Sequence, residues 1–472
     1  MKRLLVNVCR LVLAVVFILS GFVKAVDPLG TQYKIEDYLE ALGLSGILPG
    51  MATLGLSVAQ SAIEFCLGIF LLFAIRRRLT SRLVLLIMAM MTPLTLWLAL
   101  TNPISDCGCF GDAVVLTNWQ TFLKNVVLLA AAVVVVWRPT KMFRFVSESN
   151  QWIVINYSAL FILAIAAWSL YDLPQFDFRP YHVGANIREG MEIPEGAGQP
   201  RFETTFILQK DGEQREFTLD DYPDSTWTFV DSKTTQVSQG YVPPIHDFSI
   251  MLKSNGPEVS VKPDASEASV DSEAPDLTDQ VLNDSSYTFL LVSPHLENAD
   301  DSRFDLINEL YEYSHEHGYP FYCLTASTEA AIDRWRDATG AEYPFCQTDE
   351  ITLKTIIRSN PGLVLLKNGT VIGKWSHNRL PDISEEQWAQ PLQQLAIGQM
   401  PQDSVPEKIL RLLLWFVLPL MLLTIADRLW MWTKWIRRKP KKPQSSQQPQ
   451  SSQQPQSSQQ PQSSQQPQQS QK

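Results

Sequence analysis

Six apolar blocks constrain this chain more than any other feature of its sequence. Each is long enough to cross a bilayer, whose apolar core needs about 20 helical residues. A single soluble globular domain is therefore excluded, and we expect an α-helical membrane bundle. The predicted spans are Leu4–Val23, Met51–Ile75, Leu83–Leu100, Leu116–Trp137, Trp152–Tyr171 and Ile409–Trp430.

Basic residues flank these spans in a pattern that predicts their orientation. Cytoplasmic loops are enriched in Lys and Arg, so a cytoplasmic N-terminus explains all four clusters at once. The alternative for the first block is a cleaved signal peptide ending near Val23-Lys24-Ala25, but the apolar run exceeds the roughly 7–15 residues of a signal core. The clusters are Lys2, Arg3 and Arg10; Arg76, Arg77, Arg78 and Arg82; Arg138, Lys141 and Arg144; and Lys434, Arg437, Arg438, Lys439, Lys441 and Lys442.

The same topology places residues 24–50, 101–115 and 172–405 outside the cytoplasm. Residues 172–405 hold 39 Asp and Glu against 16 Lys and Arg, a net charge of −23, whereas the rest of the chain holds 10 against 23, a net of +13. A nucleic-acid binder is excluded, because it would carry a basic face on a folded domain. Six cysteines in 472 residues are also too few for a disulfide-rich scaffold.

A pair of cysteines, Cys107 and Cys109, lies in the second outside loop and is separated by one glycine. Gly108 lets the backbone bend until the sulfurs meet, and a Cys-X-Cys ring departs from relaxed disulfide geometry, which makes the bond easy to reduce. We therefore predict a redox pair. Two alternatives remain: a passive turn or staple, and a metal site with Asp106 and Asp112, which the lack of a nearby histidine disfavours.

Glu64 lies near the middle of the second predicted span. An acid at bilayer depth is costly and usually faces the interior of the bundle. It is a candidate for proton relay or for contact with a polar ligand, and a protonated packing residue is an equal alternative. Cys9 and Cys66 also lie inside spans, where we interpret them as small apolar fillers.

Three stretches resemble a known membrane family. Ser20-Gly-Phe-Val-Lys24, the span with Glu64 and Gly68, and Cys107-Gly-Cys-Phe-Gly111 are together similar to the DoxX/MauE superfamily, over residues 1–145. These are small four-helix membrane proteins, and the MauE branch is tied to methylamine dehydrogenase maturation. The resemblance implies a membrane redox role, thiol–disulfide or quinone-linked, with quinone as the candidate cofactor. It does not imply methylamine metabolism for this chain.

The remainder divides by composition and pattern. Short alternating segments indicate strands, an acidic stretch poor in aromatic residues is typical of disorder, and the Gln/Ser/Pro repeats lack residues for a core. The predicted division is a four-span membrane domain (1–145), a fifth span (146–175), a β-rich segment (176–252), a disordered acidic insertion (253–285), an α/β domain (286–400), a sixth span (401–432) and a disordered basic and Gln/Ser/Pro-rich tail (433–472).

Residues 286–400 alternate strands with helices and end in a hairpin that turns at Asn368-Gly369, which predicts a mixed sheet covered by helices. The order resembles the thioredoxin-like fold, with Asn360-Pro361 at the position of that family's cis-proline. The family places Cys-X-X-Cys after its first core strand, at the start of a helix that lowers a thiol pKa. This chain has Ser293-Pro-His295 there and no cysteine, so we expect a redox-inactive thioredoxin-like domain.

Cys323 and Cys346 occupy similar points on consecutive predicted strands of that domain. Neighbouring strands lie about 4.8 Å apart, which is compatible with a disulfide if the strands are parallel neighbours. A structural disulfide is the first interpretation. Two buried free thiols and a reactive pair are the alternatives.

The features together predict a multi-pass protein of the bacterial inner membrane, with both termini cytoplasmic and residues 172–405 extracytoplasmic. The first hypothesis is redox exchange by Cys107 and Cys109, with Glu64 as an intramembrane acid, serving an extracytoplasmic partner protein; whether this makes the chain an oxidoreductase stays open. The alternative is a non-enzymatic anchor that presents the redox-inactive domain to a partner. A transporter is disfavoured, because no internal repeat of broken helices is found. The sequence does not predict the oligomeric state.

Overall fold

The computed structural model describes residues 2–104, 106–194, 196–198, 201–210, 213–217, 228–238, 241–253, 275–401 and 405–437. Within these ranges six helices are long and apolar enough to cross a membrane, which confirms the six predicted spans. They are α1 (Lys2–Val26), α3 (Gly50–Phe73), α4 (Arg77–Thr101), α5 (Asn118–Trp137), α6 (Gln151–Tyr171) and α13 (Val405–Arg437). The predicted tail from residue 438 onward lies outside the described residues.

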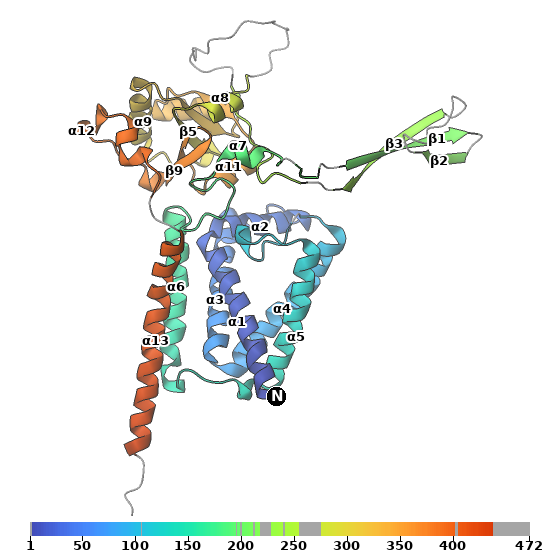
Figure 1. Cartoon of the computed structure of the whole chain (residues 1–472), viewed down its shortest axis with the longest axis vertical. Coiled ribbons are helices and arrows are strands. Elements are labelled where there is room, and N and C mark those ends of the chain that lie inside the picture. Colours follow the sequence, from blue (N-terminus) through green and yellow to red (C-terminus); the bar gives the residue numbers. More distant parts are fainter. Residues whose placement is uncertain are drawn as a thin grey trace, which may run out of the picture.

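Helices α1, α3, α4 and α5 form one bundle around a shared apolar core, while α6 and α13 pack together beside α1 and α3 (Figure 1). Phe416 of α13 lies between aromatic rings, with its centroid 4.5 Å from that of Phe161 on α6 and 5.3 Å from that of Phe65 on α3. Helix α1 approaches α3 closely at Gly21, where a Cβ atom would lie only 2.3 Å from the backbone nitrogen of Phe65. Small residues permit such close helix contacts in membranes.

A further helix, α2 (Pro28–Ala41), lies across one end of the bundle (Figure 1), and the sequence pattern did not predict it. Asp27 caps its first turn by accepting a hydrogen bond from the backbone N–H of Gly30 at 2.9 Å, and Pro28 occupies the first helical position, where proline is favoured. The loop between α4 and α5 and the α/β domain lie at this same end, opposite the N-terminus. The three segments predicted to share one side of the membrane therefore share one end of the bundle.

The α/β domain contains a six-stranded mixed sheet in the order β4-β7-β6-β5-β8-β9. Strands β5, β6 and β7 are parallel, β8 is antiparallel to β5, and β8 and β9 form the predicted hairpin at Asn368-Gly369. This arrangement is consistent with a thioredoxin-like domain, and the Asn360–Pro361 peptide bond is cis, as the resemblance implies. The strands are β4 (Met251–Leu252), β5 (Tyr287–Ser293), β6 (Phe321–Thr325), β7 (Phe345–Gln347), β8 (Gly362–Lys367) and β9 (Thr370–Ser376).

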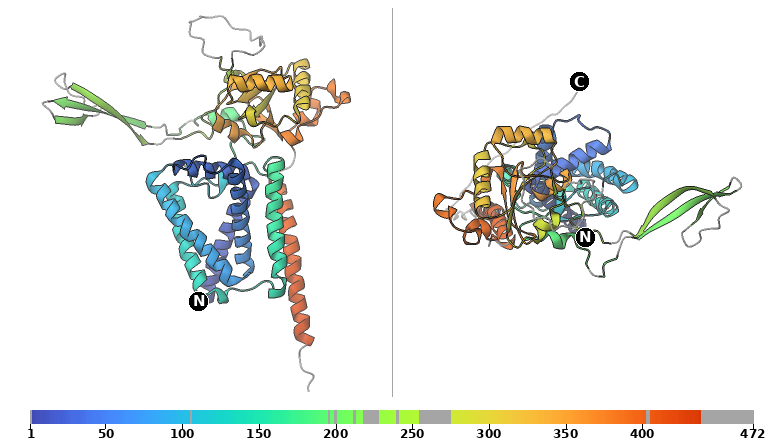
Figure 2. Two further views of the ribbon diagram at one scale, coloured as in Figure 1. Left: turned by 180° about the vertical axis from the view of Figure 1, so that it is seen from behind. Right: turned by 90° about the horizontal axis from the view of Figure 1, so that it is seen from above.

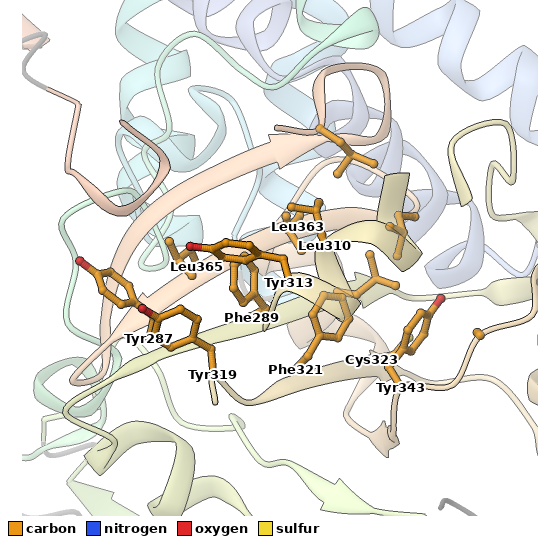
Figure 3. Packing of buried hydrophobic residues seen from close by; sticks show 14 of the residues in the cluster. Tyr287, Phe289, Leu310, Tyr313, Tyr319, Phe321, Cys323, Tyr343, Leu363 and Leu365 are labelled. Carbon is orange, nitrogen blue, oxygen red and sulfur yellow. The ribbon is translucent and has the colours of Figure 1, made fainter. Parts of the chain in front are cut away.

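Apolar layers cover both faces of this sheet, and as a result every residue of the central strand β5 is buried. Alternate residues of β5 point to opposite faces, so Phe289 and Leu291 join one layer and Leu290 and Val292 join the other. Figure 3 shows side chains of the first layer, including Phe289, Leu310 and Tyr313. The covering helices are α9 (Phe304–Glu316) and α10 (Glu329–Thr339) on the first layer, and α7 (Ile187–Met191), α8 (Thr278–Asn283) and α11 (Glu350–Ile356) on the second; the short α12 (Glu385–Trp388) follows β9.

The structure corrects the predicted disulfide between Cys323 and Cys346. The strands that carry them, β6 and β7, are parallel neighbours as expected, but Cys323 lies opposite Phe345 and Cys346 lies opposite Leu324. The one-residue offset sends the two side chains to opposite faces of the sheet, because successive residues of a strand alternate in direction. Cys323 packs beside Phe321 and Tyr343 in the first layer (Figure 3), and both thiols are free and buried.

The predicted disordered insertion is also wrong at its C-terminal end. Residues 275–285 contain α8, whose Val281 and Leu282 are buried in the second layer together with Leu277. These two adjacent apolar residues anchor the short helix although its neighbours in sequence are acidic. Residues 254–274 of the predicted insertion lie outside the described residues.

Strands also occur in the predicted β-rich segment. They form a separate antiparallel sheet in the order β2-β1-β3, which extends away from the rest of the chain (Figure 2). Its strands are β1 (Arg201–Lys210), β2 (Glu213–Phe217) and β3 (Thr228–Ser238).

The segment that follows α6 ties the α/β domain to the end of that span. Asp177 accepts hydrogen bonds from Arg179 Nε at 2.7 Å and from Lys374 Nζ on β9 at 2.8 Å. Asp172 accepts one from Ser376 Oγ at 3.0 Å. The two cations hold the pKa of Asp177 below its usual range against the opposing effect of its burial.

Candidate functional site

The cysteine pair lies in the loop between α4 and α5, at the end of the bundle that faces the α/β domain. The two sulfurs are free thiols in the structure and lie 2.8 Å apart. Gly108 between them has φ +65°, a left-handed conformation that side chains rarely adopt, and a Cβ atom there would lie 3.0 Å from Lys34 Cγ. Glycine is therefore required for this close approach of Cys107 and Cys109.

Three side chains from α1 and α2 hold the loop in place. Tyr38 donates a hydrogen bond to the carbonyl oxygen of Cys107 at 3.0 Å, and Ser20 Oγ lies 2.7 Å from the carbonyl oxygen of Cys109. Lys34 forms an ion pair with Asp106 at 2.8 Å. The carboxylate of Asp106 in turn accepts a hydrogen bond at 2.9 Å from the backbone N–H of Gly108, the residue between the two cysteines. The missed helix α2 is thus part of the site.

Glu64 faces the bundle interior, as predicted, and lies directly below this loop. Its carboxylate oxygens lie 2.8 and 2.9 Å from Lys24 Nζ, and it also receives hydrogen bonds from Ser20 at 2.7 Å and Gln60 at 3.2 Å. Lys24 is only 4 % exposed, so the ion pair is shielded from water. The sequence offered one signal for this polar cluster around Glu64: Ser20 and Lys24 lie one turn apart and therefore on the same face of α1.

Ser20 connects the ion pair to the cysteine loop. Its hydroxyl oxygen lies 2.7 Å from Glu64 Oε2 and 2.7 Å from the carbonyl oxygen of Cys109. A continuous chain of polar groups therefore runs from Lys24 and Glu64 to the backbone of the dithiol.

A small cavity of about 40 Å³ lies inside the bundle beneath the loop. Cys109 lines it together with the two ends of the buried ion pair, Lys24 and Glu64. Lys124 of α5 also lines it and lies 4.4 Å from the ring centroid of Phe110. This volume is enough for about one water molecule.

The two thiols differ in acidity because they share a hydrogen bond. The thiol of Cys107 stabilises the Cys109 thiolate, and with help from Lys124 and Lys24 this lowers the pKa of Cys109 to about 6, against the effect of burial. The same contact and burial raise the pKa of Cys107. These shifts favour the thiolate on Cys109 over that on Cys107.

This difference predicts a pH profile for alkylation. In the reduced protein, the rate of iodoacetamide reaction at Cys109 should rise through a midpoint at about pH 6 and stay level above pH 7.5, because only the thiolate reacts. Cys107→Ala removes the S–H donor, so the midpoint should move up toward the ordinary thiol value of about 8.5. Mass spectrometry of the Cys109 peptide follows the reaction. A wild-type midpoint at or above 8.5 would contradict the assignment.

The α/β domain holds polar side chains in the turn after β5 and beside the cis peptide bond. Ser293 Oγ donates to Asn360 Oδ1 at 2.6 Å, and Asn360 Nδ2 donates to the carbonyl oxygen of His295 at 2.8 Å. His295 Nε2 lies 3.0 Å from Glu350 Oε1. These groups satisfy one another, and none of them is a thiol.

Arg358 docks this domain onto the membrane domain. Its Nε lies 2.9 and 3.1 Å from the two carboxylate oxygens of Asp27, just before α2, and its Nη2 lies 3.6 Å from Asp112 in the cysteine loop. The guanidinium carbon lies 5.2 Å from the ring centroid of Tyr33, and the side chain is only 7 % exposed. Charge patterns did not single out Arg358, because its partners lie more than 240 residues away in sequence.

Fold and site together define a multi-pass membrane protein with a dithiol at one end of a four-helix unit and an α/β domain docked over it. Residues 2–138 match the family model described as Methylamine utilisation protein MauE. The membrane bundle is therefore similar to the membrane domain of that family. Residues 202–239, around β1–β3, match a Domain of unknown function (DUF8463). No curated protein and no solved structure matches the chain.

Proposed function

We propose that the membrane domain carries out thiol–disulfide exchange at Cys107 and Cys109 with an extracytoplasmic partner protein. The observation that carries this proposal is the pair itself: two sulfurs 2.8 Å apart in a loop that the bundle, α2 and Gly108 hold in place. The family name refers to methylamine utilisation; the chemistry proposed here is the exchange and not a methylamine substrate.

The reaction proceeds in two steps. The Cys109 thiolate attacks one sulfur of a partner disulfide, forms a mixed disulfide and releases the other partner sulfur as a thiolate, which takes up a proton. Cys107 then loses its proton and attacks Cys109 Sγ, which forms the Cys107–Cys109 disulfide and releases the second partner thiolate. The partner gains two electrons, which the membrane pair loses. Of the two protons that the partner thiols take up, Cys107 gives up one and the solvent supplies the other. The reverse sequence oxidises a partner dithiol.

The buried groups beneath the loop support a quinone-linked version of the same function. Glu64, Lys24 and Cys109 line one intramembrane cavity, so a proton released from the pair has a carboxylate within the same polar chain. A membrane quinone accepts two electrons and two protons and becomes the hydroquinone, which balances oxidation of the dithiol to a disulfide. In this version Glu64 is a proton acceptor and not a packing residue.

The α/β domain supplies the binding part of the function. The turn that directly follows β5 has no cysteine, and Cys323 and Cys346 are buried on opposite faces of the sheet. We therefore assign it a role in holding the partner beside the membrane dithiol. If holding the partner were the only function, the protein would be the non-enzymatic anchor of the alternative hypothesis.

A redox titration tests the proposal against that alternative. The full chain in lipid nanodiscs is equilibrated in thiol–disulfide buffers of graded potential, and the state of Cys107 and Cys109 is measured by mass after maleimide labelling. Because a Cys-Gly-Cys ring is small and strained, we expect a potential well above the roughly −300 mV of structural disulfides. A value at or below that range, or equal labelling with and without reductant, would leave only the anchor.

The orientation of the spans can be checked by reporter fusions. Fusions after Arg82, Lys141 and Lys442 should report cytoplasmic positions, because each follows a cluster of basic residues. Fusions within residues 200–400 should report extracytoplasmic positions. A cytoplasmic result for residues 200–400 would place the dithiol on the reducing side and overturn the proposed exchange with secreted partners.

A further inference from the structure

A large cavity of about 980 Å³ separates the α/β domain from the end of the membrane bundle. Gly108, the residue between the two cysteines, lies in its wall together with Gly111 and Asp112 of the same loop. Neither Cys107 nor Cys109 is among the residues of this wall, so the cavity borders the cysteine loop at Gly108 and its neighbours. The volume is at the upper end of the 300–1,000 Å³ that ligand sites of small molecules occupy.

The wall combines apolar and acidic side chains. Its apolar members include Val115 and Ile351, which are 71 % and 76 % exposed, and Phe178, which is 45 % exposed. Exposed apolar groups of this size around one cavity mark a binding surface. The acidic members are Asp27, Glu36, Asp37, Glu40, Asp112 and Glu189.

The cations of the same wall are already engaged. Arg358 is paired with Asp27 at 2.9 Å, Lys34 with Asp106 at 2.8 Å and Arg179 with Asp177 at 2.7 Å. Lys354, the fourth, is paired with Glu350.

Two acidic side chains of the wall, in contrast, have no cation paired with them among the residues that the structure describes. Glu40 and Glu189 are exposed, and neither forms an ion pair among the residues that the structure describes. Partial burial, with repulsion from Glu40, also raises the pKa of Asp37. A positive charge placed in the cavity would relieve this crowding of carboxylates.

We propose that this cavity binds an extended, cationic polypeptide segment that carries the cysteine exchanged with Cys107 and Cys109. The apolar wall contacts its side chains, and Glu40 and Glu189 pair with flanking Lys or Arg residues. The inference rests on the proposed function and names its substrate class: a secreted chain with basic residues close to its cysteine.

Activated peptides test the proposal. The reduced full chain, in nanodiscs of zwitterionic phosphatidylcholine, is mixed with nonapeptides whose single cysteine carries thionitrobenzoate, with Lys, Ser or Glu on both sides of it. Attack by Cys109 on the peptide sulfur forms a mixed disulfide and releases the coloured thionitrobenzoate anion. At low ionic strength the Lys peptide should react about 10-fold faster than the Glu peptide, and salt should reduce this ratio.

A charge-matched variant separates this cavity from the general acidity of the outside region. The double variant Glu40→Gln and Glu189→Gln should lower the Lys/Glu rate ratio at least about twofold. The double variant Glu309→Gln and Glu312→Gln, at exposed positions of α9, removes two carboxylates elsewhere and should leave the ratio unchanged.

Each outcome decides one of the two proposals. Equal rates for the three peptides, or an equal effect of the Glu309→Gln and Glu312→Gln double variant, would overturn the cationic substrate while exchange itself stands. If the protein reacts with free dithionitrobenzoate but with none of the three peptides, the cavity takes a small molecule. That result would also overturn the cationic substrate. Failure of the wild-type protein to react with any of these disulfides would overturn the proposed function.

Discussion

Cys109→Ser should abolish thiol–disulfide exchange, because serine has no thiolate at neutral pH and Cys109 is the more acidic thiol of the pair. Cys107→Ser should behave differently. Its Cys109 still attacks a partner disulfide, but no second thiol resolves the product, so the mixed disulfide should accumulate. The measurement is release of partner thiol by the full chain in nanodiscs, with non-reducing gels to detect the trapped adduct.

Both variants should insert into the membrane normally, because neither residue lies in a spanning helix. Cys66→Ser is the matched control: Cys66 lies within α3, away from the loop, and exchange should continue at the wild-type rate. Continued turnover by Cys109→Ser would refute the assigned nucleophile. Loss of both variants from the membrane would indicate a structural staple.

The second large effect concerns Arg358. Arg358→Ala removes the buried cation that pairs with Asp27 and Asp112 and leaves both carboxylates unpaired there; the Asp27 side chain is 20 % exposed and that of Asp112 is 45 % exposed. Breaking a buried pair by removing one partner costs about 3–5 kcal/mol. We expect the α/β domain to detach from the bundle while its own sheet stays folded. Hydrogen exchange should show faster exchange in α2 and the cysteine loop, and unchanged protection in β5 and β6.

The effect of Arg358→Ala should depend on pH. Burial already raises the pKa of Asp112, although Arg358 opposes this shift. Without Arg358 the pKa of Asp112 rises further. Docking should therefore be weakest at pH values above this pKa, where Asp112 is charged, and should recover as the pH falls and the carboxyl is protonated. Arg334→Ala, on the exposed face of α10, is the control and should change stability by less than about 0.5 kcal/mol. Wild-type protection in Arg358→Ala would show that the ion pairs do not hold the domain.

Much of the architecture followed from local patterns. Apolar runs predicted all six spans, because a bilayer demands length and composition that few other segments have. The hairpin of β8 and β9 turns at Asn368-Gly369, as its turn residues predicted. In the candidate site, the cysteine pair and the intramembrane acid Glu64 could be predicted from the sequence. Two cysteines separated by one glycine, and an acid inside an apolar run, are each unusual in their local sequence.

Other features escaped because their cause lies elsewhere in the chain. Helix α2 has a weak apolar pattern and is stabilised by its cap at Asp27 and by contacts with the bundle. Residues 275–285 look like a continuation of an acidic linker, yet Val281 and Leu282 complete the core of the α/β domain. Such segments gain their stability from tertiary packing rather than from local preference.

The sequence by itself determined which segments cross the membrane, that two cysteines lie in the loop between two of them, and that the turn after the strand ending at Ser293 has no cysteine. These features depend on composition and short-range spacing. The tertiary structure decided which groups meet. A one-residue register offset sends Cys323 and Cys346 to opposite faces. Close packing at Gly21 brings Lys24 to Glu64, and docking brings Arg358 to Asp27. Ion pairs between distant residues depend on the relative placement of whole elements, which no local pattern records.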